Sequence, residues 1–316
     1  MLKTAICELF GIKHPIIQGG MAHVGTAELV SAVSNAGGLG IIGAGHYQPD
    51  WVRHQILLTR TRTSLPFGLN IPLTSPFAVP VIQMALQEKV AVIATGAGNP
   101  ERYIPRFKQA GMKVIPVVAR VADAVRLEQV GADAIVAEGM ESGGHVGETT
   151  TMALVPQVVD SVRIPVVAAG GIADGRGLAA ALALGAQGVQ MGTRFVLSTE
   201  CIAHPQYKKK LLEADDQGTV VTRQTVGRSL RTLRNRLAEQ VIELEKAGIA
   251  KEELELFDLG RMYLGLIQGD LDEGSLLAGQ IAGMIKDIKP VKVIIEEMVA
   301  QAEKILNNIG NFHRDE

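Results

Sequence analysis

The sequence is poor in cysteine, in net charge and in long apolar runs, and each shortage excludes a class of protein. Its two cysteines, Cys7 and Cys201, are far apart and in no metal-ligand spacing, so we expect no disulfide scaffold and no cysteine metal site. A formal net charge of −2 gives no support for nucleic-acid binding. No apolar stretch approaches the roughly 20 residues of a membrane span. The N-terminus also lacks signal-peptide features, so we expect a cytoplasmic protein that does not bind membranes.

Several common binding and catalytic motifs are also missing. The sequence contains neither G-x-G-x-x-G after its first predicted strand nor G-x-x-x-x-G-K-[ST], so a Rossmann dinucleotide site and a P-loop are unsupported. H-E-x-x-H and C-x-x-C are absent as well. We therefore expect no bound catalytic or structural metal among the site residues.

What the sequence does contain is a regular alternation of apolar runs and amphipathic segments from residue 15 to about 200. The runs are continuous in Val, Ile and Leu, as expected for parallel strands buried on both faces. Eight such strands with helical crossovers predict an α/β fold, the (β/α)8 TIM barrel, with a doubly wound sheet as the alternative. The eight runs span residues 15–20, 39–45, 67–73, 90–98, 112–119, 133–140, 164–172 and 188–196.

The pattern changes after residue 200. Residues 200–285 are richer in charge and lack the alternation, so we expect a smaller, mainly helical second domain that acts as a lid or substrate domain. Residues 1–199 are assigned to the barrel. A C-terminal helix at 286–316 has helical periodicity and is expected to complete the barrel.

The loops that follow the predicted strands are unusually rich in glycine, and such loops build the active site of a barrel. Gly170 and Gly171 follow the seventh strand, and Gly192 and Thr193 lie in the eighth. This pattern fits a single phosphate monoester, because glycines expose backbone amides and Thr193 adds a hydroxyl. Tight turns that bind nothing are the alternative.

Two further positions favour a planar ligand. The segment 18–21, Gln-Gly-Gly-Met, offers backbone that can lie against an isoalloxazine ring. Asn70, at the end of the third strand, can donate and accept at the pyrimidine edge or ribityl chain. A flavin needs its phosphate anchored, its ring edge hydrogen-bonded and one ring face open to substrate. Each position alone is also compatible with simple packing, but together they favour a planar ligand that carries a phosphate.

His145 is the strongest single candidate for catalysis. Alone among the seven histidines, it lies in a glycine-flanked loop after a barrel strand, with Glu138 and Glu141 nearby in sequence. A histidine can donate a proton near neutral pH or hydrogen-bond a carbonyl. A solvated loop histidine without a catalytic role is the alternative.

The motifs in these loops resemble those of a known family. PIIQGGMA, TGAGNP, VAEGMESGGHVG, IPVVAAGGIADGRG, VQMGTRF and GSLLAGQIAG are similar to segments of the flavin-dependent enoyl-acyl-carrier-protein reductases of type II fatty-acid biosynthesis. Those enzymes belong with the nitronate monooxygenases, formerly called 2-nitropropane dioxygenases, in one FMN-barrel superfamily. The similarity extends from about residue 3 to about residue 285, nearly the whole chain.

The resemblance implies a reaction and a set of site residues. NADH would reduce FMN, and FMN would pass hydride to the β-carbon of a trans-2-enoyl thioester on acyl carrier protein. The resemblance does not separate NADH from NADPH, and it suggests activation by a monovalent cation and a homodimer. His145 matches the family's histidine beside the flavin. The implied FMN contacts are Gly20, Met21, Ala22, Asn70, Gly143, Gly144, Gly170, Gly171, Gly192, Thr193 and Gln280.

Two departures from the family leave the acyl preference open. His23 stands where close relatives usually carry Trp, and Arg228 stands where a histidine is common. Three other functions remain open on the same scaffold. A nitronate monooxygenase would use FMN, oxygen and a histidine base, an NADH:quinone reductase would reduce a quinone, and a flavin-storing or regulatory protein would have no turnover.

A basic stretch at 205–240 bears on the partner. It holds eight Lys or Arg residues against four acids, and Arg231 and Arg234 are among the eight. Because acyl carrier proteins are acidic, a positive surface would steer them towards the site. A solvated helix face with internal ion pairs is the alternative.

Overall fold

The computed structural model describes residues 2–258 and 260–309, and eight parallel strands in it close into a barrel. The predicted (β/α)8 fold is therefore confirmed, and β1 pairs with both β2 and β9 to close the ring. Every strand lies within one of the eight predicted runs. The barrel strands are β1 (Ile16–Gln18), β2 (Leu39–Gly43), β3 (Phe67–Pro72), β4 (Val92–Gly96), β5 (Lys113–Val118), β6 (Ile135–Glu138), β8 (Val166–Ala169) and β9 (Gly188–Met191).

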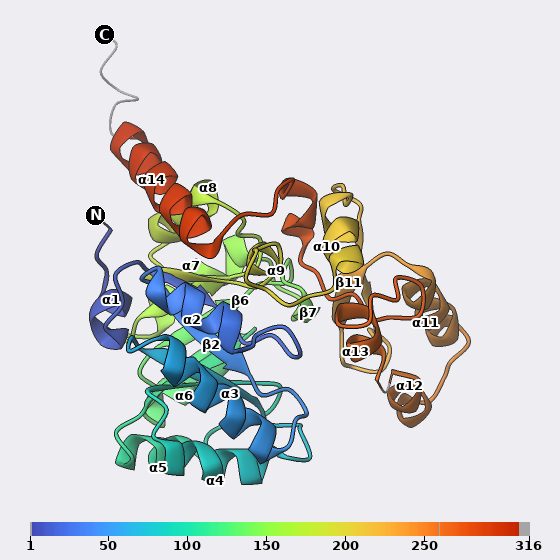
Figure 1. Cartoon of the computed structure of the whole chain (residues 1–316), viewed down its shortest axis with the longest axis horizontal. Helices are drawn as coiled ribbons and strands as arrows, with labels where there is room; N and C mark the ends of the chain where they lie inside the picture. The colour runs from blue at the N-terminus through green and yellow to red at the C-terminus, as the bar shows by residue number, and fades with distance from the viewer. Residues whose placement is uncertain (1, 259, 310–316) are drawn as a thin grey trace.

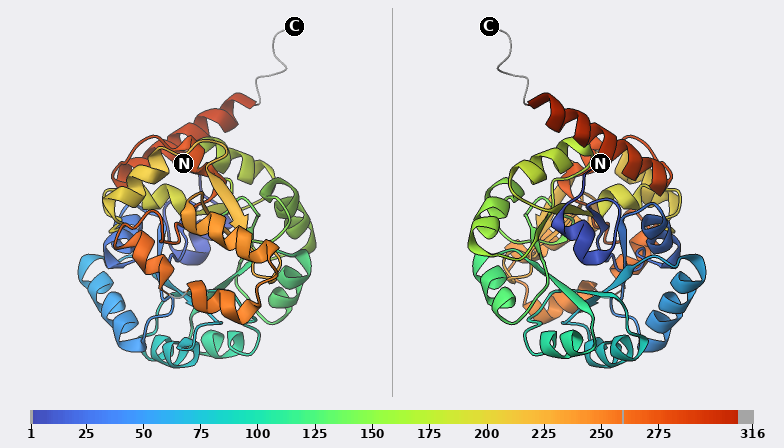
Figure 2. Two further views of the ribbon diagram at one scale, coloured as in Figure 1. Left: turned by 90° about the vertical axis from the view of Figure 1, so that its right-hand side faces the viewer. Right: turned by 90° about the vertical axis from the view of Figure 1, so that its left-hand side faces the viewer.

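Helices connect the strands (Figure 1) and form a ring around them (Figure 2). Each turns an apolar face towards the strands, which is why the amphipathic segments alternate with the apolar runs. These helices are α2 (Ala27–Asn35), α3 (Pro49–Arg62), α4 (Ala78–Glu88), α5 (Ile104–Gln109), α6 (Val121–Gln129), α7 (Thr151–Ser161) and α8 (Gly175–Ala183).

The eighth strand is shorter than its predicted run. It ends at Met191, and Gly192 caps a short helix, α9 (Thr193–Val196), where the sequence predicted more strand. All four residues of α9 are buried, so the apolar Phe195 and Val196 that prolonged the predicted run belong to a packed helix and not to a strand. The turn places Gly192 and Thr193 in the loop at the carboxyl end of β9.

The barrel interior is filled by small and branched apolar side chains, among them Ile17, Ile41, Ala94, Val136 and Val167. Helix α1 (Ala5–Phe10) contributes buried side chains to the same cluster. Figure 2 shows this N-terminal helix across one end of the barrel and the segment after residue 200 across the other. Helix α1 thus closes the end of the barrel where the strands begin, and the loops after the strands surround the opposite end, which we call the mouth.

The segment after α9 covers the carboxyl ends of the barrel strands (Figures 1 and 2). It is largely helical but also contains two strands. These pair antiparallel with each other, and β11 also pairs with β7 (Gly144–His145) from the loop after β6. The elements are α10 (Pro205–Leu212), β10 (Thr219–Thr222), β11 (Leu230–Leu233), α11 (Arg236–Lys246), α12 (Lys251–Asp258), α13 (Arg261–Leu266) and the 3-10 helix η1 (Gln280–Met284).

The chain then returns to the barrel as α14 (Val291–Ile309), which packs mainly against α8 and also against α2. The predicted C-terminal helix extended to 316, and residues 310–316 lie outside the described residues. Within the described part of the chain, no helix combines the length and apolar character needed to cross a membrane.

Candidate active site

The loop after β1 lies directly against the end of β3. A Cβ placed on Gly20 would be 2.2 Å from the Cβ of Asn70, and one placed on Gly19 would be 3.0 Å from the side chain of Gln190. Met21 reaches the other side of the mouth, where its sulfur would be 3.4 Å from a Cβ on Gly192. The absence of side chains at Gly19 and Gly20 therefore leaves backbone, Asn70 and Gln190 as the lining of the barrel mouth.

The glycine loops after β6 and β8 also meet. Gly170 has a φ of +90°, and a Cβ on it would lie 2.8 Å from the carbonyl oxygen of Gly139 and 3.2 Å from the amide nitrogen of Ser142. Glycine is favoured at this position by both the backbone conformation and the close approach. A Cβ on Gly143 would similarly meet the backbone of Ala278 at 2.6 Å.

Glu141 organises these loops from within. Its carboxylate accepts hydrogen bonds from the amide (2.9 Å) and the hydroxyl (2.9 Å) of Thr151 at the start of α7. The Thr151 hydroxyl also lies 3.1 Å from the carbonyl oxygen of Gly170. The main-chain oxygen of Glu141 accepts from the amide of Gln280 at 2.9 Å. One residue thus connects the loop after β6 with the loop after β8 and with η1.

The structure shows the hydrogen bonding of Thr193, whose hydroxyl the sequence predicts to contact a phosphate. Thr193 Oγ1 accepts a hydrogen bond of 3.0 Å from the amide of Gly279, which leaves the hydroxyl proton free to donate elsewhere. Ala169 pairs with Gln190, so the loops that carry Gly170–Gly171 and Gly192–Thr193 are neighbours. Backbone amides and one hydroxyl can therefore converge on a phosphate, as the sequence predicts.

One observation favours a bound ligand such as flavin mononucleotide at these loops, whose glycines let the loops after β1, β6 and β8 pack closely around the ends of the strands. Ser142, only 8% exposed, has a side-chain oxygen with no hydrogen-bond partner among the described residues. Buried polar atoms are rarely left unpaired, so a ligand is a natural partner for this hydroxyl.

Of the predicted contacts, Ala22 and Gln280 are the most peripheral. Ala22 faces Gly45 of the loop after β2, because a Cβ on Gly45 would lie 3.3 Å from that of Ala22. Gln280 begins η1 and its side chain is exposed. All the predicted contacts lie on the end of the barrel where the strands finish, but their role towards FMN remains a prediction.

His145 is placed in the mouth by strand pairing. It lies on β7 opposite Leu230 of β11, and its residue surface is exposed. Partial burial between the surrounding walls lowers its pKa below 6.5, and the positive charges of Arg228, Arg223 and His46 lower it further. The imidazole is therefore neutral at pH 7, able to accept a proton at one nitrogen and to donate a hydrogen bond from the other.

Sequence reasoning missed one residue near this position. The charge of His46, in the loop after β2, acts on both His145 and His23, so the three histidines lie near one another. A signal was available, since His46 directly follows the predicted strand at 39–45. Glu138, which the sequence placed near His145, ends β6 on the barrel-interior side of its strand, and burial raises its pKa to about 7.

His23, the departure from the family pattern, joins an aromatic cluster that spans the mouth. Its Nδ1 is 2.6 Å from the Tyr47 hydroxyl, and its ring is edge-on to Tyr47 at 5.3 Å and to Tyr263 at 5.5 Å. Tyr47 in turn stacks on Trp51 at 3.7 Å. Because Tyr263 lies on α13, this cluster connects the barrel loops with the segment that covers them.

The basic stretch at 205–240 does not form one exposed face, which corrects the expectation for Arg231. Arg231 is 4% exposed; its Nε donates to the Met140 carbonyl at 3.0 Å and its Nη1 to Thr219 Oγ1 at 3.1 Å. Lys208 and Arg223 are also buried. Arg234 is exposed, so it remains available to a partner.

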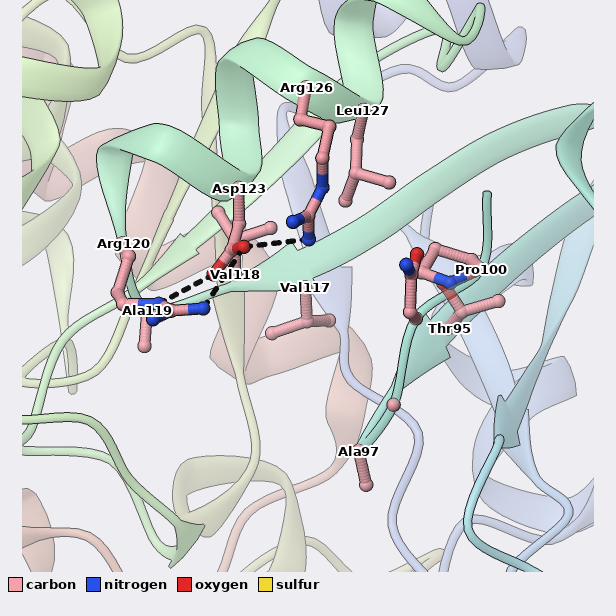
Figure 3. A pocket seen from close by; sticks show the side chains of 12 residues that line it. Thr95, Ala97, Pro100, Val117, Val118, Ala119, Arg120, Asp123, Arg126 and Leu127 are labelled. Atoms are coloured by element: carbon pink, nitrogen blue, oxygen red, sulfur yellow. Dashed lines mark hydrogen bonds and ion pairs between the residues drawn. The ribbon is translucent and has the colours of Figure 1, made fainter. Parts of the chain in front are cut away.

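A separate cavity of about 350 Å³ lies at the ends of β4 and β5 (Figure 3). Arg120 and Arg126 both pair with Asp123 at 2.8 Å across its wall, and Arg126 also pairs with Glu101. The two cations are thus balanced by two acids. None of the predicted flavin contacts lines this cavity, and the charged residues of its lining are already paired with one another or with Glu101.

Among the described residues, no group of three or more His, Cys, Asp or Glu side chains is arranged to hold a metal ion. The cation activation implied by the resemblance therefore stays a prediction.

Comparison with known proteins gives a consistent result over the whole chain. The sequence profile of the nitronate monooxygenase family matches residues 3–81 and 76–301. The solved structure of FabK from Thermotoga maritima is 48% identical with a TM-score of 0.97, and the match covers 99% of this chain and 100% of that one.

Two curated relatives carry different activities in their names. A (3aS,4S,5R,7aS)-5-hydroxy-7a-methyl-1-oxo-octahydro-1H-indene-4-carboxyl-CoA dehydrogenase of Mycobacterium tuberculosis is 36% identical, over 95% of this chain and 96% of its own length. A probable nitronate monooxygenase of Staphylococcus saprophyticus is 33% identical, over 97% of this chain and 99% of its own length.

Proposed function

This chain belongs to the nitronate monooxygenase family, whose members are flavin-dependent oxidoreductases, and we propose that within it the chain is an FMN-dependent enoyl-acyl-carrier-protein reductase. The observation that carries the proposal is the 48% identity to FabK, an enoyl-acyl-carrier-protein reductase, over 99% of the chain. The Mycobacterium relative is named for a coenzyme A thioester, so an acyl thioester substrate has support from a second protein.

In this proposal the glycine loops and Thr193 hold the FMN phosphate, and Asn70 contacts the ring or ribityl chain. FMN, when bound, supplies hydride transfer from NADH to the β-carbon of the enoyl thioester. The neutral His145 donates a hydrogen bond to the thioester carbonyl, because a lowered pKa makes a proton-rich imidazolium scarce at pH 7. Such a donor stabilises the enolate-like oxygen that develops during reduction.

Residues 200–285 act in this proposal as a lid and substrate domain over the mouth. The aromatic contact of Tyr263 with His23 lies between the lid and the barrel, so it borders the path to His145. Together with Tyr47, these side chains give the entrance an apolar wall, which suits an acyl chain.

The second candidate is a nitronate monooxygenase. It is favoured by the family profile and by the lowered pKa of His145, because a base that removes a proton from a nitroalkane must be neutral. A quinone reductase or a flavin-storing protein has no comparable observation in its favour.

The test compares three activities of the purified yellow protein in air. NADH oxidation is measured with and without a crotonyl thioester, and oxygen uptake is measured with a nitronate. We expect thioester-dependent NADH oxidation without nitronate-driven oxygen uptake. Oxygen uptake with nitronate and no response to thioester would transfer the assignment to nitronate monooxygenase.

A further inference from the structure

Glu138 and Ser142 place two polar side chains together in the barrel mouth, and neither takes part in the reaction described above. Glu138 ends β6, two residues after Val136, whose side chain is part of the barrel-interior cluster. Since side chains alternate along a strand, Glu138 points to the same interior side. The Ser142 hydroxyl lies close enough to the Glu138 carboxyl to lower its pKa against the larger, opposite effect of burial, but no hydrogen bond of regular geometry joins Ser142 Oγ to the described residues.

The strands beside Glu138 offer it no charged partner. Its register neighbour on β8 is Ala169, and the β5 residues beside β6 are Val117 and Val118. Among the described residues, no cation contributes to the ionisation of this carboxyl.

The charged residues of the adjoining loop and of the lid are engaged elsewhere. The Glu141 carboxylate is bonded to Thr151, and the Arg231 guanidinium is bonded to Met140 and Thr219. His145 interacts with Arg228, Arg223 and His46 and not with Glu138. Glu138 is thus a carboxyl group without a counter-ion at the base of the mouth.

A partly buried carboxyl group without a cation favours its neutral form, and burial raises the pKa of Glu138 to about 7. The neutral form has one O–H group that donates, and the Ser142 hydroxyl can donate as well. Both donors lie beside the glycine loops, because a Cβ on Gly170 would be 3.2 Å from the Ser142 amide nitrogen. These two donors suit a flat ligand that has hydrogen-bond acceptor atoms at its edge.

We propose that the Glu138 carboxyl and the Ser142 hydroxyl hydrogen-bond to the flavin ring, and that the proton on Glu138 sets the reduction potential of the flavin. The inference rests on the FMN site of the proposed function. Reduction adds negative charge to the ring, so a neutral donor at its edge stabilises the reduced form. Once Glu138 ionises, a carboxylate beside the ring destabilises that form, and the potential falls.

The test is the pH dependence of the flavin midpoint potential in the holoprotein, measured with reference dyes from pH 5.5 to 8.5. In the wild-type protein we expect the midpoint potential to fall more steeply with pH around pH 7, where Glu138 ionises, than at the two ends of this pH range. In Glu138→Gln, which keeps a neutral donor but cannot ionise, this steeper region should be lost. Glu148→Gln is the matched control, because Glu148 is an exposed acid of the same loop region, and it should behave as the wild type does.

A second variant keeps the test decisive if Glu138→Gln fails to fold or to hold flavin. Ser142 favours the charged form of Glu138, so Ser142→Ala should move the steep region to higher pH. A wild-type profile in Glu138→Gln, or an unmoved steep region in Ser142→Ala, would overturn the inference. A wild-type protein that binds no FMN would instead overturn the proposed function, so the two failures are distinguishable.

Discussion

Gly20 and Asn70 are so close that the smallest added side chain must displace one of them. We expect Gly20→Ala to weaken FMN binding about 10-fold or more, because its Cβ would lie 2.2 Å from that of Asn70 and push the amide out of the mouth. The measurement is flavin dissociation followed by fluorescence. Gly96→Ala is the control, since a Cβ there meets nothing within 4 Å, and equal losses in both variants would contradict the assignment of Asn70.

His145 carries the chemistry in the proposed function. We expect His145→Ala to keep the bound-flavin spectrum and to lose at least about 100-fold in kcat/KM for the enoyl thioester, the usual effect of removing a positioned acid, base or hydrogen-bond donor. His54→Ala, an exposed histidine on α3, is the matched control. Because the pKa of His145 is lowered, the acid limb of wild-type kcat/KM should lie below pH 6.5. Unchanged turnover in His145→Ala would remove this residue from the mechanism.

The raised pKa of Glu138 also predicts how the stability of the flavin-free protein depends on pH. Its pKa is raised from 4.5 to about 7 in the folded state, so the folded protein binds the proton more tightly than the unfolded chain does. Stability therefore falls as the pH rises from about 4.5 to 7, by on the order of 3 kcal/mol. Urea unfolding at pH 5 and pH 8 should show Glu138→Gln close to wild type at pH 5 and more stable at pH 8. Equal stabilities at pH 8 would show that the carboxyl ionises freely.

For individual residues, the sequence predicted which loops form the site but not the contacts that their side chains make. Glycine-rich segments after predicted strands identified the residues around Gly20 and Gly170, because the requirement for a missing side chain is visible in the sequence. The burial of Arg231 and the missing counter-ion of Glu138 were not visible, because both depend on which distant segments pack beside them. Residue type alone suggested that Arg231 is a surface cation, whereas its partners are a carbonyl of the loop after β6 and a hydroxyl of β10.

Among the elements, β7 and β11 matter most, because together they hold the loop of His145 against the lid. Arg231 of β11 adds hydrogen bonds to Met140 in the loop after β6 and to Thr219 of β10. We expect Arg231→Ala to lower the free energy of unfolding by about 2–3 kcal/mol, as a buried, charged hydrogen-bond donor is lost. Arg234→Ala, at an exposed position three residues later, should change it by no more than about 0.5 kcal/mol. Chemical denaturation measures both, and similar values for the two variants would show that Arg231 is not a structural link.

The periodicity of the sequence predicted the barrel elements and failed for the small sheet. Buried parallel strands are continuous apolar runs, and each of the eight gave one. β7 has two residues and β10 and β11 have four each, which is too short for an alternating pattern to be recognised. The predicted eighth strand ran past Met191, because the apolar Phe195 and Val196 of α9 follow closely and only the turn at Gly192 separates strand from helix.

For the whole molecule, the question is how an acyl carrier protein would approach the mouth. The burial of Arg231 removes it from any docking surface and leaves exposed cations such as Lys209 and Arg234. We expect the double variant Lys209→Glu, Arg234→Glu to lower kcat/KM about 10-fold for the carrier-protein substrate and less than about twofold for the coenzyme A thioester, since steering acts on the large acidic partner. Steady-state kinetics with both substrates at low and high salt tests this, and equal losses would exclude these cations from docking.

The pairing of β7 with β11 also affects the order in which parts of the protein fold during synthesis. Leu230, the partner of His145, is synthesised only after β9, the strand that closes the barrel onto β1. During synthesis the barrel can therefore close around its core while the His145 loop still lacks its neighbouring strand. A nascent chain arrested after residue 200 would resist proteolysis in the barrel and be cut between β6 and α7, so the His145 loop would become ordered only after the barrel has closed.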